Sequence, residues 1–276
     1  MDPVGFTARM TAAARARETE RADCLFTDPL AAALAGPEGF DFLDRHDDAF
    51  GSPQQNFAVR TRFHDDHLLT ATRDFGIRQV VLLAAGLDTR AFRLDWPSGV
   101  DLYELDQSEV LAYKETVLGA MAGQPRCTRH VVAIDLREAW PAVLLGAGYR
   151  SQEPTAWVAE GFIFYLPEVA VGRLLDDVAG LSAAGSRLNS DLPTLTFLRS
   201  ADAQAFVELY ATLGTPFQFA TDNPVSFFRR HGWNADGVRT DVQGAQLGRP
   251  LGPTPPTGPA RGMLINAQLL SNSLSS

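Results

Sequence analysis

The sequence has few cysteines, no long apolar run and little clustered positive charge. Only Cys24 and Cys127 occur in 276 residues, which gives poor support to a disulfide framework or a cysteine-based zinc site. No segment reaches the roughly 18 uninterrupted apolar residues that a membrane helix needs, and the N-terminus lacks a basic-then-apolar signal pattern. We therefore expect a soluble, cytoplasmic protein without a membrane partner.

Positive charge is too dispersed for a nucleic-acid partner. The formal net charge is −9, and basic residues form only short pairs such as Arg229-Arg230, whereas a phosphate backbone requires a basic surface. Among the histidines, His64 and His67 lie one helical turn apart, but no third metal ligand is close in sequence. These patterns favour a small-molecule partner and no bound metal. They leave the oligomeric state open between monomer and homodimer.

The hydrophobic pattern predicts one α/β domain. Residues 6–34 and 57–75 have helical character, after which short apolar runs alternate with helical segments, as in βαβ units with a parallel sheet. We predict a helical extension or cap over residues 1–76 and a Rossmann-like core with a seven-stranded, mostly parallel sheet over residues 77–270. Five prolines between Gly248 and Gly262 indicate an irregular loop or lid. The expected strands are 79–84, 101–105, 130–134, 156–159 and 187–190, with closing antiparallel strands at 236–240 and 263–270.

A turn of small residues follows the first expected strand. Ala84, Ala85 and Gly86 allow a ligand to approach the backbone at the carboxyl end of that strand, although an ordinary tight turn has the same composition. Asp106 follows Gly86 by 20 residues, a spacing that suits the ribose of NAD or of S-adenosylmethionine equally. A dinucleotide needs a glycine-rich phosphate turn. Here Asp88 would repel a pyrophosphate and suits a sulfonium or an α-amino group.

Carboxylates follow four successive strands of the predicted sheet. Asp88, Asp106, Asp135 and Glu160 occupy these positions, and the carboxyl ends of parallel strands meet at one edge. Asp135 is placed to accept from an adenine amine while Leu136 packs on the ring. Any one of these acids is also a plausible helix N-cap. All four together favour a site for a polar cofactor.

The ordered motifs of the chain resemble the leucine carboxyl methyltransferase superfamily. The resemblance is strongest to its actinobacterial S-adenosylmethionine-dependent methyltransferases, which in turn resemble O-methyltransferases of aromatic polyketide pathways. It implies a class I methyltransferase fold, with S-adenosylmethionine as cofactor and S-adenosylhomocysteine as product. The motifs are residues 16–20, 26–30, 59–63, 85–90, 93–94, 104–106, 135–137, 159–161 and 165–167.

The resemblance also implies roles for basic residues. Arg17, or alternatively Arg15, and Arg60 would hold the methionine carboxylate. Arg90 and Arg93 also match the family pattern, and ion pairs with the sheet edge or with Asp95 explain them at least as well as a substrate role.

The resemblance assigns the remaining cofactor contacts along the sheet edge. Gly86 and Asp88 form the turn, Asp106 binds the ribose, Asp135 and Leu136 contact the adenine, and Glu160 follows the fourth strand. The family turn usually begins with glycine, whereas this chain has Ala84.

The predicted activity is methyl transfer to a carboxylate or hydroxyl of a small molecule, such as a polyketide-like natural-product intermediate. Tyr165 and Asp191 are the candidate catalytic residues because each follows a strand at the expected edge. Phe227, Phe228 and Trp233 are candidates for capping a hydrophobic acceptor or, as is commoner, for the core. The alternatives are a nucleotide-dependent oxidoreductase on a similar fold and a catalytically silent cofactor-binding relative.

Overall fold

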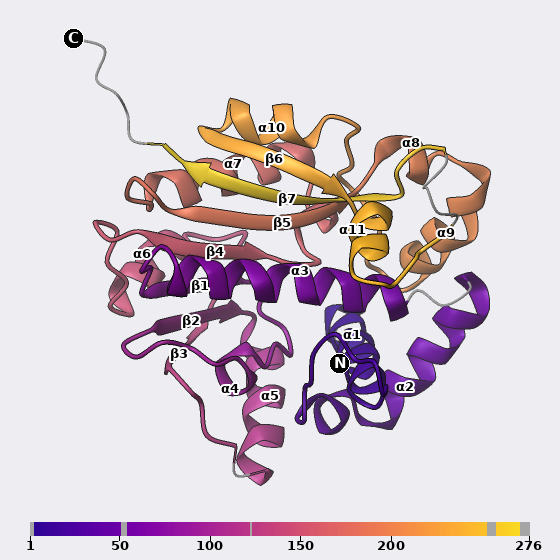
Figure 1. The fold of residues 1–276 in the computed structure, drawn as a ribbon, viewed down its shortest axis with the longest axis horizontal. Coiled ribbons are helices and arrows are strands. Elements are labelled where there is room, and N and C mark those ends of the chain that lie inside the picture. Colours follow the sequence, from indigo (N-terminus) through magenta and orange to yellow (C-terminus); the bar gives the residue numbers. More distant parts are fainter. Residues whose placement is uncertain (1–2, 51–53, 122, 253–257, 271–276) are drawn as a thin grey trace.

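A computed structural model describes residues 3–50, 54–121, 123–252 and 258–270. One seven-stranded sheet in the order β3-β2-β1-β4-β5-β7-β6 lies between two layers of helices (Figure 1). The pairs among β1 to β5 are parallel, and β7 runs antiparallel to both β5 and β6. The predicted mostly parallel α/β architecture is therefore confirmed. The strands are β1 (Gln79–Leu83), β2 (Asp101–Asp106), β3 (Thr128–Ala133), β4 (Thr155–Ala159), β5 (Arg187–Pro193), β6 (Trp233–Arg239) and β7 (Gly262–Leu269).

The central strands are apolar on both faces because helices cover both. In β1, Val80 and Leu82 enter one hydrophobic core while Val81 and Leu83 enter the other, as the two-residue period of a strand requires. The first core contains side chains from α1 to α5, and the second contains side chains from α6, α7 and α10. The helices are α1 (Pro3–Thr19), α2 (Ala31–Phe50), α3 (Gln54–Arg73), α4 (Arg90–Arg93), α5 (Ser108–Ala120), α6 (Trp140–Gly146), α7 (Glu168–Gly180), α8 (Leu195–Leu198), α9 (Gln204–Thr212), α10 (Pro224–Arg230) and α11 (Thr240–Gln246), with short 3₁₀ turns η1 (Ile163–Tyr165) and η2 (Ala201–Ala203).

The N-terminal helices cover one face of the sheet, where α3 crosses in front of β1 and β4 (Figure 1). The helical segment expected to end at residue 34 instead continues to residue 50. Gly36 has a φ of 59°, which glycine tolerates, and Pro37 then begins a new helical turn. The buried side chains of Phe42, Leu43 and His46 anchor this continuation.

The C-terminal third differs from the prediction in two places. β6 begins at Trp233, three residues earlier than expected, because Trp233 and Ala235 alternate into the core. The short helix α11 was not predicted. Phe227 and Phe228 also lie in this second core. The proline-rich loop is only partly described, since Pro253, Pro255 and Pro256 lie outside the described residues.

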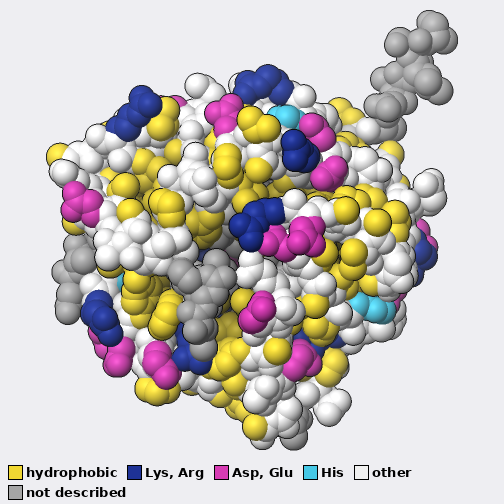
Figure 2. Space-filling model, turned by 180° about the vertical axis from the view of Figure 1, so that it is seen from behind, with side chains coloured by type: hydrophobic (Ala, Val, Ile, Leu, Met, Phe, Trp, Pro, Cys, Tyr) yellow, Lys and Arg dark blue, Asp and Glu magenta, His cyan; other side chains and the backbone are white. Residues whose placement is uncertain are grey.

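Two features of the helices and the surface bear on a membrane partner and a nucleic-acid partner. Within the described ranges, no helix is both long and apolar enough to span a membrane. On the face shown in Figure 2, charged side chains of both signs are interspersed in small groups, and the described residues there form no continuous basic surface.

A buried ion pair joins β2 to α5. Lys114 donates to Glu104 at 2.7 Å, and both side chains are fully buried. Arg129 of β3 contacts the same carboxylate oxygen at 2.7 Å. Burial raises the pKa of Glu104, but the two cations outweigh this effect and hold it below the usual value. The charge on Glu104 therefore depends on these partners.

We expect Lys114→Met to lower the free energy of unfolding by about 3 kcal/mol, because removing one partner of a buried pair leaves a poorly compensated charge. Arg129 keeps the loss at the lower end of the usual range. Urea denaturation would measure it. Glu115→Gln is the control: Glu115 is half exposed in its pair with Arg129, so its loss should stay below about 1 kcal/mol. Equal midpoints for the two variants would contradict the prediction.

Candidate functional site

A cavity of about 840 Å³ opens at the carboxyl ends of β1, β4 and β5. β1 lies between β2 and β4, so the strand order reverses direction here, and open α/β sheets bind ligands at such a switch point. Side chains from the N-terminal helices and from the C-terminal segment complete the walls. Of the predicted site residues, the cavity is lined by Arg60, Gly86, Asp88, Asp106, Glu160, Tyr165 and Asp191.

The turn after β1 is left-handed at two positions. Gly86 has a φ of 52° and Ala84 a φ of 53°; glycine adopts this conformation freely, but alanine is strained in it. Ala84 is the single non-glycine residue with positive φ in the described part of the chain. A glycine in place of Ala84, as the resemblance led us to expect, would adopt this left-handed conformation without strain.

Asp106 fixes this turn from the end of β2. One of its carboxylate oxygens accepts the Gly86 N–H at 2.6 Å, and the other accepts the Gln107 N–H at 2.7 Å. Each oxygen keeps a further lone pair for a ligand hydroxyl. Burial raises the pKa of Asp106 above its ordinary value. The cavity thus contains a desolvated acceptor next to a backbone that admits close approach.

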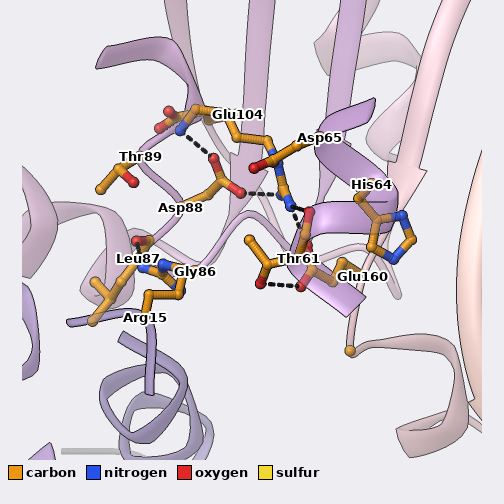
Figure 3. Close-up of polar contacts among 12 residues, drawn as sticks. Arg15, Thr61, His64, Asp65, Gly86, Leu87, Asp88, Thr89, Glu104 and Glu160 are labelled. Atoms are coloured by element: carbon orange, nitrogen blue, oxygen red, sulfur yellow. Dashed lines mark hydrogen bonds and ion pairs between the residues drawn. The ribbon is translucent and has the colours of Figure 1, made fainter. Parts of the chain in front are cut away.

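A buried guanidinium joins the ends of β1 and β4 to α3. Arg90 donates to Asp65 at 2.7 Å and to Glu160 at 2.7 Å, and it pairs with Asp88. Asp65, Asp88 and Glu160 point toward this common centre (Figure 3). Arg93 also pairs with Asp65, at 2.6 Å. The suggested partner Asp95 instead pairs with Arg73.

Arg60 of α3 forms a second bridge beside the first. Its Nε donates to Glu160 at 3.0 Å, and its Nη1 lies 3.4 Å from Asp191. A Cβ at Gly161 would lie 3.1 Å from this guanidinium, so the glycine makes room for it. Burial raises the pKa of Glu160, but Arg90 and Arg60 outweigh it and hold the pKa well below the ordinary value. Glu160 is therefore ionised.

The two candidate catalytic residues both reach the cavity. One oxygen of Asp191 accepts the Gly161 N–H at 2.7 Å, which leaves the other near Arg60. His64 is buried behind, with its Nε2 3.5 Å from Asp191. Burial raises the pKa of Tyr165 well above its ordinary value, so its hydroxyl is protonated and neutral. The Asp191 carboxyl group and the Tyr165 hydroxyl thus both line this cavity.

The structure places only one of the two arginines suggested for the methionine carboxylate at the cavity, and which of them binds it stays a prediction. Arg15 lines the cavity, where it donates to the Leu87 carbonyl at 2.6 Å and to Asp28 at 2.8 Å. Arg17 pairs with Asp44 and is not among the described lining residues. The spacing of residues along α1 could have distinguished the two arginines. Ala8, Thr11 and Arg15 repeat at about four residues and share one face, whereas a residue two positions further points away.

Asp135 and Leu136 are also outside the described lining of the cavity. The Asp135 carboxylate accepts from Arg137 at 2.9 Å, both from its backbone N–H and from its Nε. It therefore shapes the loop after β3. A role for Asp135 or Leu136 in adenine binding stays a prediction.

Sequence reasoning missed a group of aromatic side chains in the cavity wall. They come from α2, α3, α9 and the segment after α9, which no short motif links. The residues are His46, Phe57, Phe206, Tyr210 and Phe217. Among the residues that the structure describes, no group of three or more His, Cys, Asp or Glu could hold a metal ion.

The fold and the site together define a class of protein. The sheet order, the reversed β7 and the acid at the end of β2 form a class I methyltransferase fold. Two solved structures share it: a putative methyltransferase from Thermobifida fusca (TM-score 0.70, 17% identity, 96% of this chain and 94% of that chain), and a DUF574 family protein from Streptomyces avermitilis (TM-score 0.67, 13% identity, 95% and 96%).

The chain belongs to the leucine carboxyl methyltransferase family, which matches residues 8–179. A relative from Mycobacterium marinum is 42% identical over 250 residues, covering 84% of this chain and 82% of its own length. A relative from Parafrankia sp. is 42% identical over 280 residues, covering 96% and 87%. Both are named "Putative S-adenosyl-L-methionine-dependent methyltransferase".

Ala84→Gly tests the strain in the turn. Relief of a left-handed alanine is worth about 1–2 kcal/mol, and the greater freedom of glycine in the unfolded chain removes about 0.4–1 kcal/mol of it. We expect a net gain of about 0.5–1 kcal/mol, measured by thermal unfolding. Ala85→Gly is the matched control, because Ala85 is not left-handed and should lose stability. A loss in both variants would show that Ala84 is unstrained.

Proposed function

We propose that this S-adenosylmethionine-dependent methyltransferase transfers the methyl group to an oxygen of a small molecule. One observation carries the proposal: Asp106 and the left-handed turn at Gly86 line the same cavity as Tyr165 and Asp191. A cofactor bound at the turn and an acceptor bound at the two oxygens would therefore meet inside one enclosed space.

The side chains present suit the cofactor's functional groups. Asp106 has free lone pairs for ribose hydroxyls, and Asp88 and Glu160 are acids for the amino group and the sulfonium. Arg15 and Arg60 are the lining arginines proposed to hold the methionine carboxylate, in addition to their ion pairs with protein carboxylates. The Asp88 carboxylate beside the turn is unfavourable for a pyrophosphate, which argues against the oxidoreductase alternative, as does the family. Asp135 and Leu136 would need to approach from outside the present lining.

Catalysis by this chain would consist mainly of alignment. When bound, the cofactor would supply a methyl group activated by a sulfonium, so that attack of an acceptor oxygen on the methyl carbon would displace the thioether sulfur. Holding the two reactants in register in a dry site provides about 7–11 kcal/mol of the barrier. Arg60 of α3 and Arg90 of α4 hold Glu160 and Asp191 by ion pairs. The walls can therefore orient a ligand without rearranging.

Asp191 and Tyr165 are proposed to act on the acceptor. The carboxylate of Asp191 would accept the proton of a hydroxyl acceptor, while the neutral Tyr165 hydroxyl would orient the oxygen by a hydrogen bond. A carboxylate acceptor is already ionised at neutral pH and requires no base. The half-apolar lining is suited to a natural-product-like molecule.

Asp106→Ala should weaken S-adenosylmethionine binding more than tenfold without unfolding the chain, because the variant loses a buried acceptor for the ribose. Isothermal titration with S-adenosylmethionine and S-adenosylhomocysteine would measure the change. Asp95→Ala is the control: Asp95 forms an exposed pair with Arg73, and its variant should bind normally. Unchanged affinity in Asp106→Ala would contradict the cofactor placement.

Turnover of matched hydroxyl and carboxylate compounds tests the oxygen chemistry. Methyl esters release methanol in alkali, whereas methyl ethers do not, so labelled cofactor distinguishes the two products. Absence of any labelled product from a cofactor-binding protein would favour the catalytically silent relative.

Asp191→Asn should lower kcat for hydroxyl compounds by at least about 100-fold, because no base remains to take the proton. It should leave turnover of carboxylate compounds and cofactor affinity within a few fold, since asparagine still offers an oxygen to the Gly161 N–H. Equal loss for both acceptor types would assign Asp191 to positioning instead.

A further inference from the structure

One part of the cavity wall is an aromatic chamber, defined here as His46, Phe57, Tyr165, Phe206, Tyr210 and Phe217. All six side chains line the cavity. Tyr165, Phe206 and Phe217 are only partly buried, although they pack against the first core. A ring that only filled the core would have no surface that faces a cavity. These rings instead present surface to an enclosed space.

Several rings of the chamber lie nearly parallel to one another. Phe217 stacks on Tyr165 with centroids 5.8 Å apart and an interplanar angle of 26°, and on Phe206 at 4.9 Å and 30°. Tyr210 and Tyr165 are also stacked, at 6.4 Å and 21°. Offset stacking of this kind favours a further planar ring over a bulky saturated one. The shape of the wall therefore selects for a flat ligand.

The charges around the chamber disfavour an anionic ligand. The chamber contains no cationic side chain, and the neighbouring Arg60 is already paired with Glu160 and Asp191. Arg261 is exposed to solvent. Among the described lining residues, carboxylates outnumber arginines: Asp88, Asp106, Glu160, Asp191, Asp202 and Asp241 stand against Arg15, Arg60, Arg90 and Arg261. The aromatic chamber itself therefore offers an anionic acceptor no cationic side chain to pair with.

The polar atoms of the chamber are neutral. The Tyr210 hydroxyl and His46 Nε2 lie 3.4 Å apart. Burial lowers the pKa of His46 to about 4 and raises that of Tyr210, so both are uncharged at neutral pH. Together with Tyr165 they offer hydrogen bonds to a neutral polar substituent without requiring a charge.

We propose that the aromatic chamber binds an uncharged, planar aromatic alcohol, and that the reacting group is its phenolic hydroxyl. The proposal rests on the proposed function and narrows it from carboxylate or hydroxyl to hydroxyl. In the reaction a bond forms between the phenolic oxygen and the methyl carbon while the methyl–sulfur bond breaks. The hydroxyl proton passes to the Asp191 carboxylate, and the sulfur leaves as the neutral thioether.

Calorimetric titration of three matched probes into protein saturated with S-adenosylhomocysteine tests the proposal. Naphthol is planar and neutral, naphthoate is planar and anionic, and decahydronaphthol is neutral and saturated. We expect naphthol to bind at least about tenfold more tightly than either of the others. Preferred binding of naphthoate or decahydronaphthol, or no detectable binding of naphthol, overturns the proposal.

A pair of variants two residues apart separates the chamber from general packing. Phe217→Leu removes a stacking surface inside the chamber from a ring that packs against both cores, whereas Phe219→Leu alters the second core alone. Naphthol affinity should fall about tenfold in the first variant and stay unchanged in the second, while S-adenosylhomocysteine affinity stays unchanged in both. Equal naphthol affinity in both variants counts against the chamber.

The cofactor titration distinguishes this proposal from the proposed function. If S-adenosylhomocysteine does not bind to the unaltered protein, the proposed function itself fails. If the cofactor binds and carboxylate compounds yield alkali-labile esters while naphthol is ignored, methyl transfer to oxygen stands and only the acceptor class is wrong.

Discussion

The site depends on one buried cation that holds three carboxylates together. Arg90 connects the loop after β1, the end of β4 and helix α3 through Asp88, Glu160 and Asp65. Three like charges at such short range would repel one another in an apolar environment. The positively charged guanidinium compensates this repulsion. A buried network of ion pairs does not by itself increase the free energy of unfolding. Its effect is to fix the cavity walls relative to the strands.

The sequence predicted the parts of the fold that periodicity and local chemistry control. Apolar runs such as residues 79–83 are buried on both faces, and they were recognisable as central parallel strands. Asp106 was placed by its distance from Gly86. The predicted helix ended too early because Gly36 and Pro37 resemble a helix end. The helix α2 continues beyond them, and its Phe42 and Leu43 side chains are buried in the core. Tertiary burial outweighed the local breaking signal there.

Side-chain destinations were harder to predict than backbone elements. The sequence motif allows either Arg15 or Arg17 to reach a ligand. The direction of each side chain on α1 decides which one lines the cavity. Asp135 follows a strand as Asp106 does, yet an Arg137 partner engages it locally. The aromatic chamber was beyond local reasoning because its six residues come from segments between positions 46 and 217. Only the folded chain brings them together.

The two halves of the cavity are built from different parts of the chain, and this separates their functions. The turn at Gly86, Asp106 and Glu160 belong to the strand ends of the core, which have the geometry of the fold class. The chamber comes largely from α2, α3 and α9, and the outer wall is completed by the segment near Pro250. That segment is held to α1 by buried Arg249, which contacts Asp23 at 2.6 Å and Glu18 at 3.2 Å. Because these additions form the proposed acceptor half, they can change without disturbing the strand ends. The proposal therefore assigns acceptor specificity to the ring-lined wall and cofactor binding to the strand ends.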